Sequence, residues 1–192
     1  RFQDEEIPET GTKERMTMKI FTVSMAPVNP PYDDGVKNIL VGLARRLRDH
    51  HFYFVSSFYG RRFPGEENVT FIRSPFQRTG KHSMSLLQKM FVAVLVLMNI
   101  RKADMFQFFV TPQKHFSAFF SALLRKGGKR SIQVLSSVHT LRELNGERDP
   151  AELFFADDVV VYSDFAKEYL EQRGVRGVIR IYPGIDTGRF VK

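Results

Sequence analysis

Histidines are the side chains here that best suit acid–base chemistry near neutral pH. The chain has five, His50, His51, His82, His115 and His139, and no cysteine. No two histidines lie three to five residues apart with a carboxylate partner, so the spacing of a zinc-binding helix is absent. The lack of cysteine excludes disulfides, thiolate metal sites and a cysteine nucleophile. We therefore expect no metal site and no cofactor.

His139 is the most interesting of the five because it directly follows an expected strand, in Ser-Val-His-Thr. Ligands of open parallel sheets bind beyond the carboxyl ends of the strands. There, His139 could hydrogen-bond a sugar hydroxyl or a phosphate, or transfer a proton, with Thr140 beside it. Alternatively, neighbouring backbone groups satisfy the imidazole. Lys114 follows another strand in the same way, where a helix cap and a solvated rim are the simpler interpretation.

A second candidate is Gly35, which begins an expected helix after a loop that contains Tyr32 and Asp34. A glycine at a helix start lets backbone N–H groups approach an anion, and the helix dipole favours the charge. A simple turn would also use a glycine. Lys37 lies in the first turn of the helix and could pair with Asp34. The pattern is neither the three-glycine dinucleotide fingerprint nor a Walker A loop.

Two adjacent carboxylate pairs, Glu66-Glu67 and Asp157-Asp158, are poor candidates for paired acid–base work. Neighbouring residues at a strand edge point in opposite directions. Solvated charge is the interpretation that we favour. The sequence also contains no GxSxG elbow, which a serine hydrolase of the α/β type would need.

Strand-like and helix-like segments alternate and would place these residues. We expect strands over 19–25, 52–57, 69–73, 105–110, 130–136, 158–162 and 177–181, and helices over 35–48, 84–100, 115–125 and 164–173. This alternation predicts an α/β fold: a Rossmann-like, doubly wound, mainly parallel sheet with helices on both faces. We expect residues 1–17 to be a flexible extension and residues 18–192 to form one domain, which suits the length.

The chain carries a net charge of +8, with 29 Lys and Arg against 21 Asp and Glu. This excess favours an anionic partner. In the helix expected over 84–100, eight consecutive apolar residues, 91–98, lie between Lys89 and Arg101-Lys102. The run is shorter than the roughly 20 residues of a spanning helix. The helix is either buried against the sheet or part of a surface that docks on anionic lipid.

Several motifs in a fixed order resemble one family. They are MKIFTVSM, then a Pro-Pro and Gly35, LARRLRDH, SVHT, DDVVVYS, and finally IYPGIDTGRF. Together they resemble the N-terminal domain of GT-B glycosyltransferases of the glycogen-synthase-like group, family 4, from about Met18 to Lys192.

The resemblance implies two Rossmann-like domains that face a cleft. The first mainly holds the acceptor, and the second binds the nucleotide-sugar and carries a Glu-x7-Glu motif. Transfer of the hexosyl group retains anomeric configuration and needs no metal. By the match, His139 contacts the transferred sugar as the catalytic candidate, Gly35 approaches the donor phosphate or the acceptor, and Ser163 caps a helix. We add Asp34, Lys37, Tyr32, Thr140 and Lys114 as substrate-binding candidates.

Two departures stand out. Asp34 occupies the place where most members have a second glycine, and its carboxylate would repel a diphosphate. The donor domain does not follow within the 192 residues. We therefore expect an acceptor-side half of a retaining transferase, inactive alone, whose acceptor is a carbohydrate or lipid-linked, in the cytoplasm or on the cytoplasmic face of a membrane.

The alternative is a non-catalytic Rossmann-like module that binds an anionic partner, either acidic lipid or nucleic acid. The net charge supports it. However, no RNA- or DNA-binding motif appears, and aromatic residues are not interleaved with the basic runs. The sequence therefore argues against nucleic acid.

Overall fold

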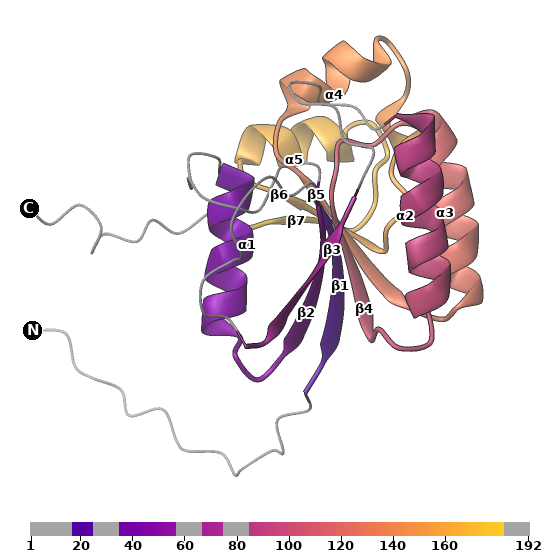
Figure 1. Cartoon of the computed structure of the whole chain (residues 1–192). Coiled ribbons are helices and arrows are strands. Elements are labelled where there is room, and N and C mark those ends of the chain that lie inside the picture. The colour runs from indigo at the N-terminus through magenta and orange to yellow at the C-terminus, as the bar shows by residue number, and fades with distance from the viewer. Residues whose placement is uncertain (1–16, 25–34, 57–66, 75–84, 183–192) are drawn as a thin grey trace, which may run out of the picture.

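The protein has an α/β architecture built on one seven-stranded sheet (Figure 1). The computed structural model describes residues 17–24, 35–56, 67–74 and 85–182. The strands are β1 (Lys19–Ser24), β2 (His51–Ser56), β3 (Val69–Arg73), β4 (Met105–Phe109), β5 (Arg130–Leu135), β6 (Asp158–Val161) and β7 (Val178–Arg180). The helices are α1 (Gly35–Arg46), α2 (Leu86–Asn99), α3 (Lys114–Lys126), α4 (Val138–Asn145), α5 (Asp164–Glu171) and a short 3-10 turn (Pro150–Glu152).

The sheet is parallel throughout, in the order β3-β2-β1-β4-β5-β6-β7. The chain builds outward from β1 to β3, returns to the other side of β1 and continues to β7. The order therefore reverses between β1 and β4, the point at which doubly wound folds bind ligands. The predicted fold class is confirmed, and the expected strands and all four expected helices are present with ends shifted by a few residues.

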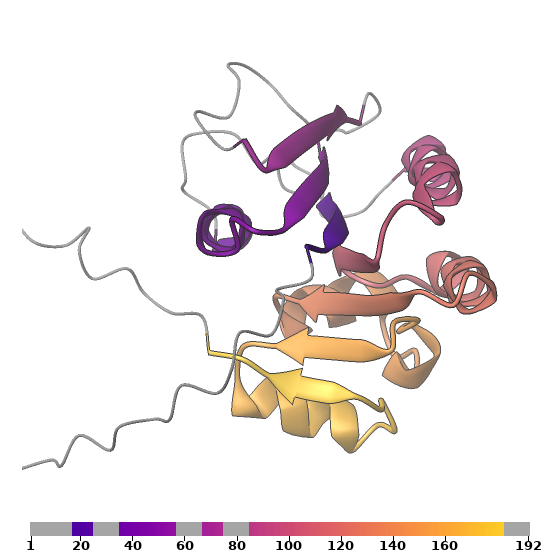
Figure 2. The ribbon, with the colours of Figure 1, turned by 90° about the horizontal axis from the view of Figure 1, so that it is seen from below.

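Strand residues alternate between the two faces of the sheet. Phe21 and Phe106 pack with Val92 and Val96 of α2 and with residues of α3. On the opposite face, Ile20 packs with Leu40 of α1. Seen along the strands, α1 therefore lies on one side of the sheet and α2 and α3 on the other (Figure 2). A third cluster holds α4 and α5 against β5 and β6.

Serine caps begin three of the helices. The hydroxyls of Ser85, Ser137 and Ser163 accept hydrogen bonds from the backbone N–H three residues onward, as N-caps do. The cap predicted at Ser163 is confirmed. Helix α4 was not expected, since the sequence predicted no helix between the strands over 130–136 and 158–162. Eight residues make only about two turns, too few for a clear apolar period.

Glycine is required at the turn before β7. Gly177 has a φ of +68°, and a Cβ there would lie 2.4 Å from the Asp157 carbonyl oxygen. A side chain would clash with the backbone and favour a different φ. This contact fixes how the last strand enters the sheet.

Helix α2 is apolar on both sides, which neither interpretation of the sequence described. Gln88, Val92 and Val96 are buried against the sheet and its neighbours. Six apolar side chains on the opposite side are exposed: Leu86, Leu87, Met90, Val94, Leu97 and Met98. The helix is thus buried on one face only. Among the described residues, no helix has the length and hydropathy that a membrane crossing requires.

Candidate functional site

The carboxyl edge of the sheet, around β1, β4 and β5, brings together the ends of the candidate segments. β1 and β5 both pair with β4. β1, which precedes α1, and β5, which precedes α4, are therefore separated by one strand, with about 10 Å between their axes. The first residues after β4 lie between them.

Gly35 is the first residue of α1 and is exposed. It is not among the glycines with positive φ, and a Cβ there would meet nothing within 4 Å. Neither the backbone conformation nor packing against the described residues requires glycine at this position. The open space is what a backbone approach to a ligand needs.

Lys37 is buried, with 8% of its surface exposed. It lies on the side of α1 that also buries Leu40, Val41 and Ala44. A lysine in such a place is seldom left without polar partners. Tyr32 and Asp34 lie outside the described residues, so the pairing of Asp34 with Lys37 stays a prediction. Lys114 is the first residue of α3, and its side chain is likewise outside the described part of the structure.

His139 lies in the first turn of α4, where its side chain is 82% exposed. Its Nε2 is 3.1 Å from Oε1 of Glu143, one turn along the same helix. The Thr140 backbone N–H donates to the Ser137 cap at 3.2 Å. The imidazole is therefore accessible and held on the helix surface by a carboxylate. The two neighbours that we predicted together, His139 and Thr140, start the same helix.

Sequence reasoning missed a pair of hydrogen bonds that tie the edge together. Lys89 of α2 donates from Nζ to Oε1 of Gln113, the residue before α3, at 2.6 Å. Partial burial lowers the pKa of Lys89. Asn145, at the end of α4, donates from Nδ2 to the carbonyl of Pro112 at 3.0 Å. These bonds fix the segment after β4 between α2 and α4, and no sequence pattern links their partners.

A further group lies at the ends of β6 and β7. Asp164 accepts hydrogen bonds from the Tyr182 hydroxyl at 2.7 Å and from the Arg180 guanidinium. These two bonds, with the charge of Arg180, hold the pKa of Asp164 below its usual value. Nearby in sequence, burial raises the pKa of Tyr162 to about 12. The group tethers the last strand to α5.

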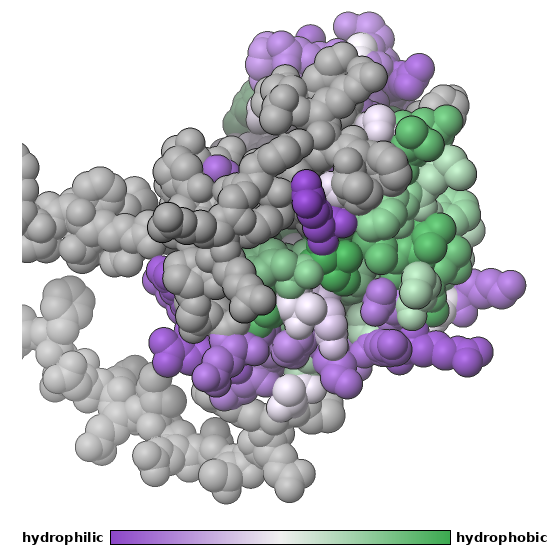
Figure 3. Space-filling model, viewed as in Figure 1, coloured by the Kyte–Doolittle hydropathy of each residue, from purple (hydrophilic) through white to green (hydrophobic). Residues whose placement is uncertain are grey.

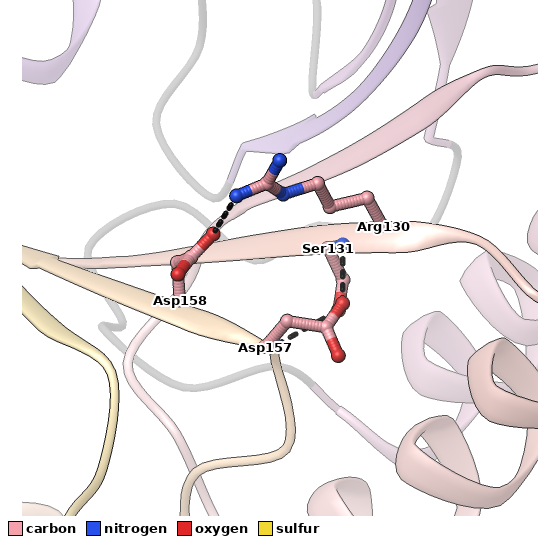
Figure 4. Close-up of polar contacts among 4 residues, drawn as sticks. All are labelled: Arg130, Ser131, Asp157 and Asp158. Atoms are coloured by element: carbon pink, nitrogen blue, oxygen red, sulfur yellow. Dashed lines mark hydrogen bonds and ion pairs between the residues drawn. The ribbon is translucent and has the colours of Figure 1, made fainter.

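The opposite, amino edge of the sheet holds the adjacent pair Asp157-Asp158 (Figure 4). Asp157 accepts hydrogen bonds from the backbone N–H of Ser131 at 2.8 Å and from its hydroxyl at 2.9 Å. Asp158 lies 3.4 Å from a nitrogen of Arg130. The pair is therefore structural rather than simply solvated charge.

These carboxylates, with Arg125, Gly128, Lys129 and Arg130, line an open hollow of about 360 Å³. The hollow lies at the amino edge, at the other end of the strands from the candidate site. Across the described residues, no cluster of three or more His, Asp or Glu side chains could hold a metal ion.

Comparison with known proteins identifies the family. Residues 34–189 match the model of the family described as Glycosyltransferase Family 4. A search of curated proteins gives no significant match. The catalytic domain of Arabidopsis thaliana starch synthase IV, bound to ADP and acarbose, superposes with a TM-score of 0.58 at 12% identity. The comparison covers 91% of this chain and 53% of that one.

The apo form of the lipopolysaccharide outer core galactosyltransferase WaaB gives a TM-score of 0.51 at 13% identity. It covers 88% of this chain and 46% of that chain. The protein thus spans about half the length of both structures, and at such identities the likeness concerns the fold. The family match covers most of the sheet and helices. The chain therefore belongs to glycosyltransferase family 4.

Proposed function

We propose that this domain is the acceptor-side part of a retaining glycosyltransferase that moves a hexosyl group from a nucleotide-sugar to a carbohydrate or lipid-linked acceptor. The observation that carries the proposal is that two helices, α1 and α4, follow strands beside the strand-order reversal. One holds Gly35 in open space, and the other presents an accessible His139. This arrangement lies in the segment that matches the family.

In the proposed reaction, His139 hydrogen-bonds a hydroxyl of the sugar being transferred. Glu143 orients the imidazole from one turn away. The start of α1 at Gly35 receives the acceptor or a donor phosphate oxygen, with Lys37 and Asp34 close in sequence. Tyr32, Thr140 and Lys114 complete the acceptor contacts at the same edge. No resident metal or cofactor takes part.

We propose that a second domain supplies the groups that bind the nucleotide. Charge develops on the leaving diphosphate, and its stabilisation is commonly the largest catalytic contribution. The starch synthase structure, nearly twice as long as this chain, contains ADP, a nucleoside diphosphate. We therefore expect the 192-residue chain alone to show no transfer and weak binding of nucleotide-sugar.

The test is His139→Ala in an enzyme that joins this domain to its donor domain. Loss of a hydrogen bond made in the transition state should lower kcat about 100-fold. Sugar transfer is measured with a radiolabelled nucleotide-sugar. Arg142→Ala is the matched control, since Arg142 is exposed on the same helix. Near wild-type kcat for His139→Ala, with normal folding, would remove His139 from the site.

A further inference from the structure

The exposed side of α2 is an apolar stripe on a protein surface. Its six members are Leu86, Leu87, Met90, Val94, Leu97 and Met98, with exposed fractions from 47% to 73%. At 100° per residue they occupy an arc of about 120° along the whole helix. The buried residues Gln88, Val92 and Val96 lie on the opposite side. We call these six residues the α2 stripe.

The exposed apolar surface extends beyond the α2 stripe onto the neighbouring helix. Phe119 of the neighbouring α3 is 48% exposed, and α2 and α3 are in contact. Figure 3 shows the apolar surface gathered on the side of the molecule that α2 forms. A helix that is apolar all round is normally covered on all sides. A contiguous exposed patch of this kind marks an interaction surface.

Positive charge predominates around the stripe. Residues 85–103 contain three Lys or Arg, residues 113–130 contain five, and neither segment contains Asp or Glu, although the exposed Asp104 directly follows the first segment and Asp158 pairs with Arg130. These two segments together carry +8, which equals the net charge of the whole chain. Arg101 and Lys102 follow the end of α2, Arg125 and Lys126 end α3, and all four are exposed. Cations therefore border the apolar surface at one end.

We propose that the α2 stripe docks on the surface of an anionic lipid bilayer. Its apolar side chains would enter the boundary between headgroups and acyl chains, while the bordering cations contact lipid phosphates. Surface-lying helices combine these two features. The helix has 14 residues, about 21 Å, against a hydrocarbon core of about 30 Å, so it would lie on the membrane.

Charge also argues against a second copy of this chain as the occupant. A symmetric dimer with parallel α2 helices would bring the same cations of both copies together, and one with antiparallel helices would offer these cations no carboxylate from α2. Like charges brought together oppose association. An anionic bilayer would neutralise the cations and also cover the apolar side chains of the α2 stripe. The inference concerns the outward side of α2 and does not rest on sugar transfer.

The test is co-sedimentation of the 192-residue chain with vesicles of equimolar phosphatidylglycerol and phosphatidylcholine, and with vesicles of phosphatidylcholine alone. We expect binding to the anionic vesicles that weakens at high salt, as screened attraction does. The triple variant Leu87→Gln/Met90→Gln/Val94→Gln should bind about 100-fold more weakly, since methylene groups no longer enter the lipid. Arg101→Gln/Lys102→Gln should lose about thirtyfold at low salt, from about fivefold for each cation near an anionic surface.

Two controls match these variants. Phe165→Gln removes an apolar side chain on α5 that is 68% exposed, and Arg142→Gln/Arg148→Gln removes two exposed cations elsewhere. Both should bind as the wild type does. The proposal is overturned if the wild type does not bind anionic vesicles, or if the triple variant binds equally well. A concentration-dependent dimer that the triple variant abolishes, without vesicle binding, would also overturn it and assign the stripe to a second copy.

Discussion

Helices α1 and α2 pack against opposite faces of the same sheet, and their outer sides differ. α1 buries Leu40, Val41 and Ala44, and its outward positions include Asn38 and Arg46. α2 buries an inner face of similar size but directs leucine, methionine and valine outward. The inner faces serve the fold in the same way. The difference teaches that the outer side of α2 has a task that the stability of this domain does not require.

If the outer side of α2 contributed to folding as the inner side of α1 does, substitutions on the two sides would lower the free energy of unfolding by similar amounts. Leu40→Ala should lower the free energy of unfolding by about 2–5 kcal/mol, because the fully buried side chain leaves a cavity. Met90→Ala removes a side chain that is 59% exposed and should change it by about 0.5 kcal/mol or less. Urea denaturation measures both. A loss above 2 kcal/mol for Met90→Ala would mean that the stripe is covered in the folded chain.

On the face of the sheet that α1 covers, Tyr162 packs in the same cluster as Leu40. The pH dependence of stability tests how well this face is buried. Burial raises the pKa of Tyr162 to about 12 from an ordinary 10.0. Below pH 10 both states keep the proton. Between those pH values the unfolded state loses its proton first, so stability falls as pH rises.

Tyr162→Phe should therefore lose less stability than the wild type between about pH 10 and about pH 12, since the unfolded tyrosine ionises first in that window. The difference between the two proteins is read from urea midpoints at each pH. Identical pH profiles would show that the phenol is hydrated in the folded protein.

The smallest expected effect concerns the outer side of α2 alone. Leu97→Gln/Met98→Gln should change the free energy of unfolding by about 0.5 kcal/mol or less, because both side chains are exposed and glutamine is a good helix former. The variant should nevertheless be more soluble than the wild type, as measured by light scattering during concentration. If light scattering stayed the same and the free energy of unfolding fell, the outer side of α2 would contribute to folding and would not be an exposed surface.

Much of the fold follows from local patterns. Short apolar runs predicted every strand, and Ser163 was predicted as the cap that begins α5. Helix α4 was not predicted because its sequence, VHTLRELN, is short and mostly polar. Its two turns are stabilised by the Ser137 cap and by burial of Val138 and Leu141 against neighbouring elements. Such tertiary support leaves no period in the sequence.

The candidate site was predicted in part. The position of His139 after a strand and of Gly35 at a helix start followed from the alternation of elements. The bonds from Lys89 to Gln113 and from Asn145 to Pro112 join residues 24 and 33 positions apart. Only the packing of three elements brings these partners together. The exposed side of α2 could not be predicted either, because a helix sequence that is apolar on all sides does not indicate which side the sheet will cover.

The three-residue strand β7 affects how copies of a domain with exposed apolar side chains can associate. It lies at one end of the sheet and carries Arg180, whose guanidinium is bound to Asp164. A short edge strand with a charge offers little backbone on which another sheet could grow. Protein copies crowded together by their apolar helices would thus meet an edge that resists continuous β-pairing. We therefore expect the short, charged β7 to limit continuous β-pairing between copies.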